Sequence, residues 1–362
     1  MLSVLQIEGF RAFSQYTVED LGCVNLFVGR NNSGKTTVLE AAEILLAADS
    51  AAAVIGSPIR RGEMYVPAQQ DKPGQYADVS HLFYGHVYDP GQRFRISGTE
   101  SGNKLWLTCK VDEIGDRSTR ERFETLGLID SWLDIEHSRS GGRSQHVPMM
   151  PSGAVPLDEV RQRRPKTSPE ERPVSLVRAE TPDAEKLREF WGEIALTDEE
   201  PRVTESLRIL EPRIERIAFV PTRSAYSSSL EGIYVRLSGV ENRMPLGTLG
   251  DGVRHILALA VAVSRSRHGF VMIDEIDTGL HHSVMADVWR ALIETAERLD
   301  VQVFATTHSL DCVRSLAWLA NTQPELCRGV RMHRVDSERS KTVAYGPEEI
   351  SIAAEQHVEM RG

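Results

Sequence analysis

The amino-acid sequence predicts an α/β fold in which helices cover a mixed, mostly parallel sheet and a partly β lobe is inserted into the chain. Two observations support this prediction. From about residue 217 to 348, short apolar runs alternate with helix-like segments, and such alternation is typical of parallel sheets covered by helices. Near the N-terminus, a glycine-rich segment at 29–36 joins an apolar run to another helix-like segment.

The N-terminal block, about residues 1–50, is expected to contain strand, loop and helix. Residues 4–10 and 23–29 are rich in Val, Ile, Leu and Phe, which favours strands. The apolar positions of Thr37–Leu46 suit a helix.

The C-terminal block, about residues 217–362, repeats strand and helix. Strands are expected at 217–221, 270–273 and 301–307, and helices at Ile256–Ser264, Ser283–Leu299 and Leu310–Leu319. In the second of these helices the apolar residues recur at helical spacing, which predicts a stripe that faces the core. The members of this stripe are Met285, Val288, Trp289, Leu292, Ala296 and Leu299.

The middle, residues 51–216, is expected to be an inserted lobe. Residues 81–88, 93–98 and 104–111 look extended, which predicts antiparallel strands. The range of about 137–184 is polar and rich in Ser, Gly, Pro and Arg, so we expect a mobile loop there. Its basic cluster is either a solvated loop or a contact for nucleic acid or a partner, and consists of Arg161, Arg163, Arg164 and Lys166.

Composition indicates an ordinary globular protein. The 362 residues predict about two structural units, or one with a large insertion, and 41% of them are hydrophobic, enough for a buried core. The net charge of −10 argues against binding nucleic acid by bulk charge, so any such contact would be local.

The sequence also predicts a cytoplasmic location and no membrane partner. Its longest apolar stretch, Ile256–Val263, is far shorter than the roughly 18 residues that cross a bilayer. No basic region precedes an apolar core at the N-terminus, so no secretory signal is expected. The four cysteines lack CxxC spacing, which predicts reduced, buried thiols.

Gly29–Thr36 matches the phosphate-loop pattern GxxxxGK[ST], directly after an apolar run and before a helix. Its glycines let backbone N–H groups approach phosphate oxygens, and the helix start adds a partial positive charge. Lys35 would reach the β- and γ-phosphates, and Thr36 would hold Mg²⁺. The expected nucleotide contacts are Asn31, Asn32, Ser33, Gly34, Lys35, Thr36 and Thr37.

Three further residues are expected at the same edge of the sheet, because ligands of parallel sheets lie beyond the carboxyl ends of the strands. Asp274 closes an apolar run and is placed to bind Mg²⁺, and Glu275 follows it and would orient or deprotonate water. His308 ends the next run and is expected to sense the γ-phosphate.

A second glycine-rich helix start lies at 245–254 and includes Gly250 and Gly252. Helix starts of this kind bind anions. Since one loop already cradles the nucleotide, this start is expected to face the nucleotide of a second copy of the chain. The alternative is a plain glycine turn that caps a core helix.

The order of these motifs resembles the ABC-type ATPase heads of the SMC, RecF and OLD (overcoming lysogenization defect) group, and OLD-like AAA family ATPases without a Toprim domain in particular. The resemblance covers about 1–48 and 217–348 and rests on VLQIEGFRAF, GRNNSGKTT, LGDGVRHILALA, VMIDEIDTGLHH and ATTHS. It implies an ABC-type head of the P-loop NTPase fold. It also implies that Lys35, Thr36 and Asp274 are ligands of ATP and Mg²⁺, that Glu275 is the catalytic glutamate, and that His308 is the switch histidine.

The same resemblance implies that Gly252 is the signature glycine that contacts the γ-phosphate across a head-to-head dimer. Gly250 stands where the family has a serine, and His281 stands at the position of the D-loop aspartate. No Q-loop glutamine is assigned, because the polar stretch around it offers Gln69, Gln70 and Gln75 alike. Arg11 and Arg223 follow expected strands and would either touch the nucleotide or form surface salt bridges.

Parts of the related proteins are not expected in this chain. The segment between the two blocks is broken by Pro and Gly, which excludes a coiled-coil arm. The late acidic residues are scattered along expected closing strands, so no Toprim-like carboxylate cluster and no nuclease activity are predicted. These residues are Asp336, Glu338, Glu348 and Glu349.

The leading expectation is a cytoplasmic ATPase that closes a head-to-head homodimer, or a higher even oligomer, on ATP and Mg²⁺. It would control a separate effector, a nuclease or toxin, in anti-phage defence. One alternative is a DNA repair or recombination ATPase, and another is a nucleotide-gated scaffold with little turnover. A small-molecule kinase would need a bound acceptor, and a transporter subunit would carry a Q-loop and an LSGGQ-like serine.

Overall fold

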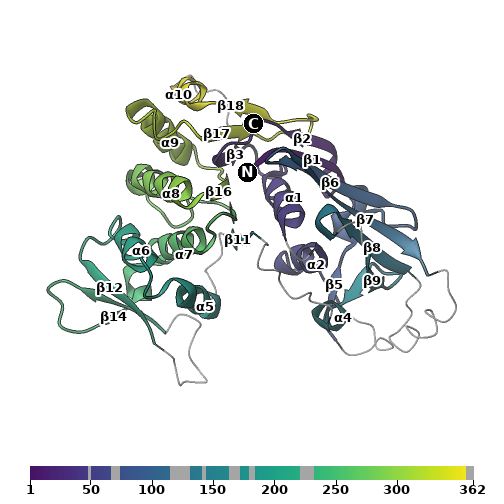
Figure 1. Cartoon of the computed structure of the whole chain (residues 1–362), viewed down its shortest axis with the longest axis horizontal. Helices are drawn as coiled ribbons and strands as arrows, with labels where there is room; N and C mark the ends of the chain where they lie inside the picture. Colours follow the sequence, from purple (N-terminus) through teal and green to yellow (C-terminus); the bar gives the residue numbers. More distant parts are fainter. Residues whose placement is uncertain are drawn as a thin grey trace. The chain divides into compact units, whose positions relative to one another are not determined.

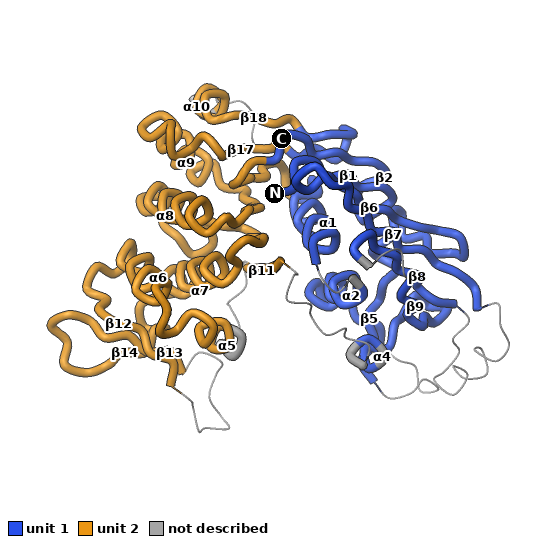
Figure 2. Tube along the Cα trace, viewed as in Figure 1, with its two compact units in different colours: residues 1–21, 32–171, 335–342 blue, residues 22–31, 172–334, 343–362 orange. Residues whose placement is uncertain are grey.

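The structure is a computed structural model that describes residues 1–47, 50–66, 74–114, 131–140, 144–162, 172–178, 184–220 and 232–355. The chain divides into two compact units (Figure 2). Unit 1 consists of Met1–Leu21, Asn32–Glu171 and Val335–Thr342, and unit 2 of Gly22–Asn31, Arg172–Arg334 and Val343–Gly362.

Unit 1 is built on a six-stranded antiparallel sheet with the order β2-β1-β6-β7-β8-β9 (Figure 1). Its strands are β1 (Leu2–Phe10), β2 (Phe13–Val18), β6 (Arg93–Glu100), β7 (Asn103–Glu113), β8 (Ser131–His137) and β9 (Ser144–Met149). In β7, buried residues alternate with partly exposed ones, as in a strand with one face on a core. α1 (Lys35–Leu46) contacts β1, β6 and β7, and α2 (Ser50–Arg60) contacts β8.

The expected extended segment at 81–88 is wrong. These residues form part of two 3-10 turns, η1 (Ser80–Leu82) and η2 (Tyr84–His86). Gly85 has a φ of 73°, which is outside the strand region and turns the chain.

The expected loop at about 137–184 is also corrected where the structure describes it. Besides β9 and the 3-10 turn η3 (Ser138–Ser140), it contains β10 (Ala154–Pro156), α4 (Leu157–Gln162) and β11 (Val174–Val177). β10 pairs with β5 (Tyr76–Asp78), which pairs with β4 (Met64–Tyr65). These elements form because apolar residues scattered among the polar ones are buried in the core of unit 1. Val147, Met149, Ala154, Val155 and Leu157 are each at most 5% exposed.

Unit 2 contains the predicted mostly parallel sheet, with the order β11-β15-β16-β3-β17-β18. Its remaining strands are β3 (Val24–Val28), β15 (Phe270–Ile273), β16 (Gln302–Thr306), β17 (Val330–Arg334) and β18 (Val343–Tyr345). Only the β17–β18 pair is antiparallel. Every residue of β3, β15 and β16 is buried, as expected for strands covered on both faces.

The helices of unit 2 are α5 (Ala184–Ile194), α6 (Glu199–Leu207), α7 (Asp251–Arg265), α8 (Met285–Leu299), α9 (Leu310–Thr322) and α10 (Pro347–Glu355), with the 3-10 turns η4 (Leu246–Leu249) and η5 (His282–Val284). They include the three predicted ones, as α7, α8 and α9, and three that the sequence did not predict, α5, α6 and α10. Glu348 and Glu349 lie in the first turn of α10, so the expected closing strand there is wrong. Among the described residues, no helix is long and apolar enough to cross a membrane.

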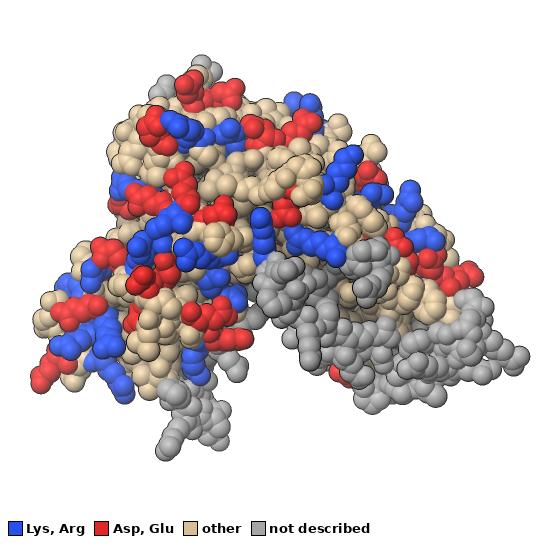
Figure 3. All heavy atoms as spheres, viewed as in Figure 1, with Lys and Arg blue, Asp and Glu red and all other residues tan. Residues whose placement is uncertain are grey.

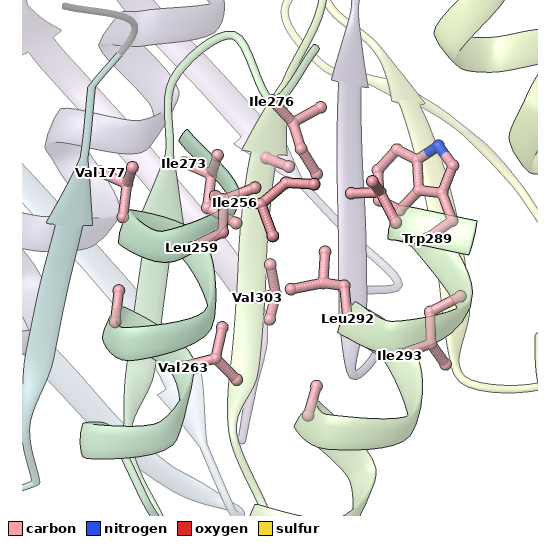
Figure 4. Packing of buried hydrophobic residues seen from close by; sticks show 14 of the residues in the cluster. Val177, Ile256, Leu259, Val263, Ile273, Ile276, Trp289, Leu292, Ile293 and Val303 are labelled. Carbon is pink, nitrogen blue, oxygen red and sulfur yellow. The ribbon is translucent and has the colours of Figure 1, made fainter. Parts of the chain in front are cut away.

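The predicted apolar stripe of α8 forms part of the core of unit 2, and each of its members is at most 6% exposed. Figure 4 shows Trp289 and Leu292 of α8 and Ile256 of α7 directed towards the strands, with Val303 of β16 between them. Trp289 Nε1 also donates to the carbonyl oxygen of Cys312 at 3.2 Å. The stripe prediction is confirmed.

The expected strand at 217–221 lies in a different sheet. β12 (Ile214–Phe219) pairs with β13 (Ile233–Leu237), which pairs with β14 (Met244–Pro245), all antiparallel. In β12 only Ile214 and Ile217 are buried, because one face is polar, whereas β3, β15 and β16 at the centre of the parallel sheet are buried throughout.

The unit boundaries differ from the expected ones. β1, β2 and α1 belong with the lobe that the sequence assigns to 51–216, because β1 pairs with both β2 and β6. Residues 172–216 belong to unit 2, because β11 pairs with β15. The described residues of the predicted lobe, 51–216, are therefore divided between the two units.

The cysteines are free and buried, as predicted. Burial raises the pKa of Cys23 and of Cys327 to about 11. Neither thiol is therefore available as a thiolate near neutral pH.

Candidate functional site

The glycine-rich loop lies between a buried strand and a helix, as predicted. β3 ends at Val28 in unit 2, and α1 begins at Lys35 in unit 1. Between them, Gly29, Asn32 and Gly34 have φ values of 151°, 62° and 98°. Left-handed residues in such a loop turn backbone N–H groups into a shared concavity, which suits phosphate oxygens.

Gly34 is required at the end of the loop for two reasons. Its φ of 98° and ψ of 11° are left-handed, a region that other residues avoid. In addition, a Cβ at this position would lie 2.3 Å from Cζ of Phe13. Phe13 is buried and stacks on Tyr16 with 4.1 Å between ring centroids. This aromatic pair therefore fixes the position of the last glycine of the loop.

The start of α1 is suited to an anion. Its N-cap, Gly34, makes no side-chain hydrogen bond, and its first turn has no acidic residue, so the partial positive charge of the helix start is not offset there. The Oγ atom of Ser33 is buried and has no hydrogen-bond partner among the described residues. A buried hydroxyl of this kind fits a site that a ligand completes.

Asp274 and Glu275 directly follow β15, and Thr306 of the neighbouring strand connects them. Thr306 Oγ1 donates to Oδ1 of Asp274 at 2.7 Å and accepts from the N–H of Glu275 at 2.9 Å. β15 and β16 are parallel, so both ends meet at one edge of the sheet. Sequence reasoning missed Thr306, although its place at the end of an apolar run is a visible signal.

Glu275 combines an uncommon backbone conformation with an accessible carboxylate. Its φ is 55°, and non-glycine residues with such values cluster at functional sites. Its side chain is 44% exposed, and its Oε1 lies 3.4 Å from Nδ1 of His308. The structure therefore brings together Glu275 and His308, as predicted for the edge of the sheet.

The residues on both sides of His308 are fixed. Thr307 Oγ1 donates to Oδ1 of Asp277 at 2.5 Å and accepts from the N–H of Ser309 at 2.9 Å. Ser309 caps α9 by accepting from the N–H of Cys312 at 3.3 Å. His308 thus projects from a short, well-anchored turn between β16 and α9.

The second predicted anion site is the start of α7, which lies in unit 2. Gly250 is the N-cap with a φ of 94° and makes no side-chain hydrogen bond. A Cβ on Gly252 would lie 2.6 Å from the carbonyl oxygen of Gly279, so the backbone of α7 directly touches the loop after Glu275. Asp251 lies in the first turn and pairs with Arg254, whose Nη1 is 2.9 Å from Oδ1.

The donors predicted for Mg²⁺ suit that ion chemically. Thr36 offers a hydroxyl and Asp274 a carboxylate, and Mg²⁺ prefers oxygen ligands while keeping several waters. The described residues contain no group of three or more His, Cys, Asp or Glu side chains that could hold a metal ion.

Other candidate residues have different surroundings. His281 is exposed, and its Nδ1 lies 2.9 Å from Oγ of Ser283 at the start of η5. Gln75 is exposed beside β5, whereas Gln69 and Gln70 lie outside the described residues. Arg163, Arg164, Lys166 and Arg223 also lie outside the described residues, as does the side chain of Arg161.

Arg11 forms a salt-bridge network within unit 1. Its side chain is 6% exposed, forms an ion pair with Glu40 at 2.7 Å, and donates a hydrogen bond to Glu63 at 2.9 Å. Ser57 accepts a further bond from Arg11 at 2.9 Å. Of the two roles considered for Arg11, the structure supports salt bridging, and the bridges are buried rather than on the surface.

Comparison with known proteins adds a family match. Residues 24–311 match the AAA_21 family, described as "AAA domain, putative AbiEii toxin, Type IV TA system". An ATP/GTP phosphatase from Helicobacter pylori is 19% identical over 340 residues, which cover 87% of each chain. An uncharacterized protein from Methanocaldococcus jannaschii is 31% identical over 65 residues, 18% of this chain and 57% of that one.

Two solved structures of SMC heads are also similar. The SMC head domain from Thermotoga maritima has a TM-score of 0.43 at 13% identity, over 95% of this chain and 98% of that one. The Smc head domain from Pyrococcus furiosus, bound to the C-terminal domain of ScpA, has a TM-score of 0.47 at 13% identity, over 99% of both chains.

Proposed function

The chain belongs to the AAA_21 family, and from this premise we propose that it is a P-loop ATPase that hydrolyses ATP at the loop 29–36. One observation carries the proposal. Thr306 holds Asp274 and Glu275 together at the end of the parallel sheet, and His308 lies beside Glu275. A metal-binding carboxylate next to a second, accessible carboxylate is the arrangement that hydrolysis by water requires.

In this proposal the loop and the start of α1 bind the triphosphate. The Lys35 amine reaches the β- and γ-phosphates, and the Ser33 hydroxyl donates to a phosphate oxygen. Thr36 and Asp274 would hold Mg²⁺, which would neutralise charge on the phosphates. The proposed contacts of the loop are Asn31, Asn32, Ser33, Gly34, Lys35, Thr36 and Thr37.

Glu275 and His308 act on the attacking water and the γ-phosphate. A water oxygen bonds to the γ-phosphorus, the bond from that phosphorus to the β–γ bridging oxygen breaks, and ADP leaves. Glu275 accepts the proton that the water gives up. His308 would contact a γ-phosphate oxygen from the neighbouring strand end, so that Glu275 is aligned only when a triphosphate is present.

The assembly that we propose is a head-to-head homodimer or a higher even oligomer. Gly250 and Gly252 open α7, and its start would bind the γ-phosphate of the partner's nucleotide through backbone N–H groups. Because Gly250 has no hydroxyl, this contact depends on the backbone. A Cβ on Gly252 would meet the carbonyl oxygen of Gly279, whereas a Cβ on Gly250 would meet nothing within 4 Å, so the start of α7 is open at Gly250.

We further propose that the ATPase cycle controls a separate effector, a nuclease or a toxin, in anti-phage defence in the cytoplasm. The description of the matched family, which names a toxin of a toxin–antitoxin system, supports this setting. The name of the Helicobacter pylori relative, an ATP/GTP phosphatase, supports turnover rather than a static scaffold. The nuclease chemistry is assigned to the effector rather than to this chain.

The test is Glu275→Gln, which keeps the shape of the side chain but removes the proton acceptor. We expect ATP binding to be retained and turnover to fall by roughly 10²- to 10⁴-fold. Glu294→Gln is the matched control, because Glu294 is exposed on α8, outside the site. Normal turnover by Glu275→Gln, measured as phosphate release, would remove Glu275 from the mechanism.

A further inference from the structure

His255 is a buried histidine that the proposed mechanism does not use. It lies one turn into α7, three residues after Gly252, and is 4% exposed. Its Nε2 lies 3.0 Å from the carbonyl oxygen of Ile276, the residue directly after Glu275. A carbonyl oxygen only accepts, so Nε2 carries the proton and donates it.

Burial favours the neutral form of the His255 imidazole. Burial lowers its pKa, while the hydrogen bond to Ile276 and the charge of Asp277 act in the opposite direction. A neutral ring with its proton on Nε2 is a fixed donor. The bond from His255 therefore persists near neutral pH.

This bond completes a set of contacts that holds Glu275 in its left-handed backbone conformation. The N–H of Glu275 donates to Thr306 Oγ1 at 2.9 Å, and the N–H of Ile276 donates to the carbonyl oxygen of Thr306 at 3.0 Å. β16 thus holds the backbone through Thr306, and α7 holds it through His255. Strained conformations persist only where their surroundings over-determine them.

The first turn of α7 touches the same loop a second time. The backbone of Gly252 approaches the carbonyl oxygen of Gly279, as described above. Gly279 has a φ of 71°, and a Cβ on it would lie 3.4 Å from the backbone N of Gly252. Between these contacts, Asp277 accepts from Thr307, the neighbour of His308. The start of α7 and the loop 275–279 are therefore packed directly against each other.

We propose that His255 is a positioning residue that ties the anion-binding start of α7 to the backbone of Glu275, so that the arrival of the partner's nucleotide is transmitted to the catalytic carboxylate of the same chain. The inference rests on the proposed function, because it requires turnover at Glu275 and a partner's phosphate at α7. It adds a physical link between the two nucleotide sites of the dimer.

The test compares three proteins: the parent chain, His255→Met and His255→Gln. Methionine fills the site without a donor, whereas the glutamine amide nitrogen can replace Nε2. For His255→Met we expect kcat to fall about 10- to 100-fold, as misplacement of a catalytic group by about 1 Å does. Binding of a slowly hydrolysed ATP analogue should stay within twofold of the parent. The Hill coefficient of turnover against ATP should fall to one. His255→Gln should restore kcat and the Hill coefficient to the parent values.

Other outcomes have separate meanings. A parent chain without ATP turnover contradicts the proposed function itself. A parent with turnover and a His255→Met variant with unchanged kcat and Hill coefficient contradicts the role of His255. A His255→Gln variant as impaired as His255→Met, with equal melting temperatures, contradicts the hydrogen bond as the cause. If His255→Met does not fold, His255→Asn replaces it, because its amide is one carbon too short to reach Ile276.

Discussion

At the scale of single residues, the site depends on side chains that fix other side chains. The hydroxyl of Thr306 accepts a hydrogen bond from the backbone N–H of Glu275 and donates one to the carboxylate of Asp274. The hydroxyl of Thr307 donates one to the carboxylate of Asp277. These threonines touch neither water nor phosphate in the proposed mechanism, yet they set the direction of the carboxylates. Removing such a threonine displaces the catalytic group that it positions. The rate of hydrolysis then falls steeply, although the threonine itself does not contact the reacting atoms.

Gly34→Ala is expected to destabilise the protein and abolish nucleotide binding. The added Cβ would clash with the Phe13 ring, and alanine would have to adopt the left-handed backbone conformation of Gly34. We expect a loss of about 2–4 kcal/mol in the free energy of unfolding, from left-handed strain and overpacking together. Thermal unfolding and binding of a fluorescent ATP analogue measure the two effects.

Gly91→Ala is the matched control for this substitution. Gly91 has a φ of 92°, and a Cβ there would meet nothing within 4 Å. It should therefore cost only the strain, about 1–2 kcal/mol, and leave nucleotide binding unchanged. Equal losses of stability in the two variants would show that the Phe13 contact does not matter.

The sequence predicts the site residues unevenly. Lys35 and Thr36 belong to one contiguous pattern with a local chemical meaning, and Asp274 and Glu275 belong to another, so all four are visible in one sequence. His255 is different, because its partner lies 21 residues away on another element. The sequence around a buried histidine in an apolar helix does not show which residue its side chain will hydrogen-bond to in the folded chain.

At the scale of elements, hydrophobic periodicity predicts β3, β15 and β16 and the helices α7, α8 and α9, because strands buried on both faces and helices with one apolar stripe have distinct patterns. It fails at 81–88, where aromatic and β-branched residues favour a strand but Gly85 turns the chain. It also fails to assign β12 to its sheet. The pairing of a strand depends on partners that a single sequence does not display.

Trp289→Phe tests the packing of α8. The smaller ring leaves a cavity in the core and removes the donor to the Cys312 carbonyl. We expect a loss of about 2–4 kcal/mol, measured by denaturant unfolding. Trp318→Phe on α9 is the control, since Trp318 is 52% exposed. If the two substitutions cost the same, the core position of Trp289 is not what stabilises this helix.

At the scale of the whole molecule, the chain passes from unit 2 into unit 1 within the phosphate loop, because β3 belongs to one and α1 to the other. The sequence predicts two units but not their boundaries, since β1 and β6 pair across more than 80 intervening residues. On the face in Figure 3, basic and acidic side chains of the described residues are interspersed. This face offers no broad basic surface for nucleic acid, which agrees with the net charge of −10.

The central claim is that a triphosphate bound at the loop is completed by a second copy of the chain. The most direct measurement is the molar mass by light scattering, together with retained nucleotide, for purified protein given Mg²⁺ and a slowly hydrolysed ATP analogue. The account predicts that nucleotide is retained and the mass doubles, or rises to a higher even multiple, and that Lys35→Ala shows neither change. A parent protein that neither retains the nucleotide nor changes its mass would contradict it.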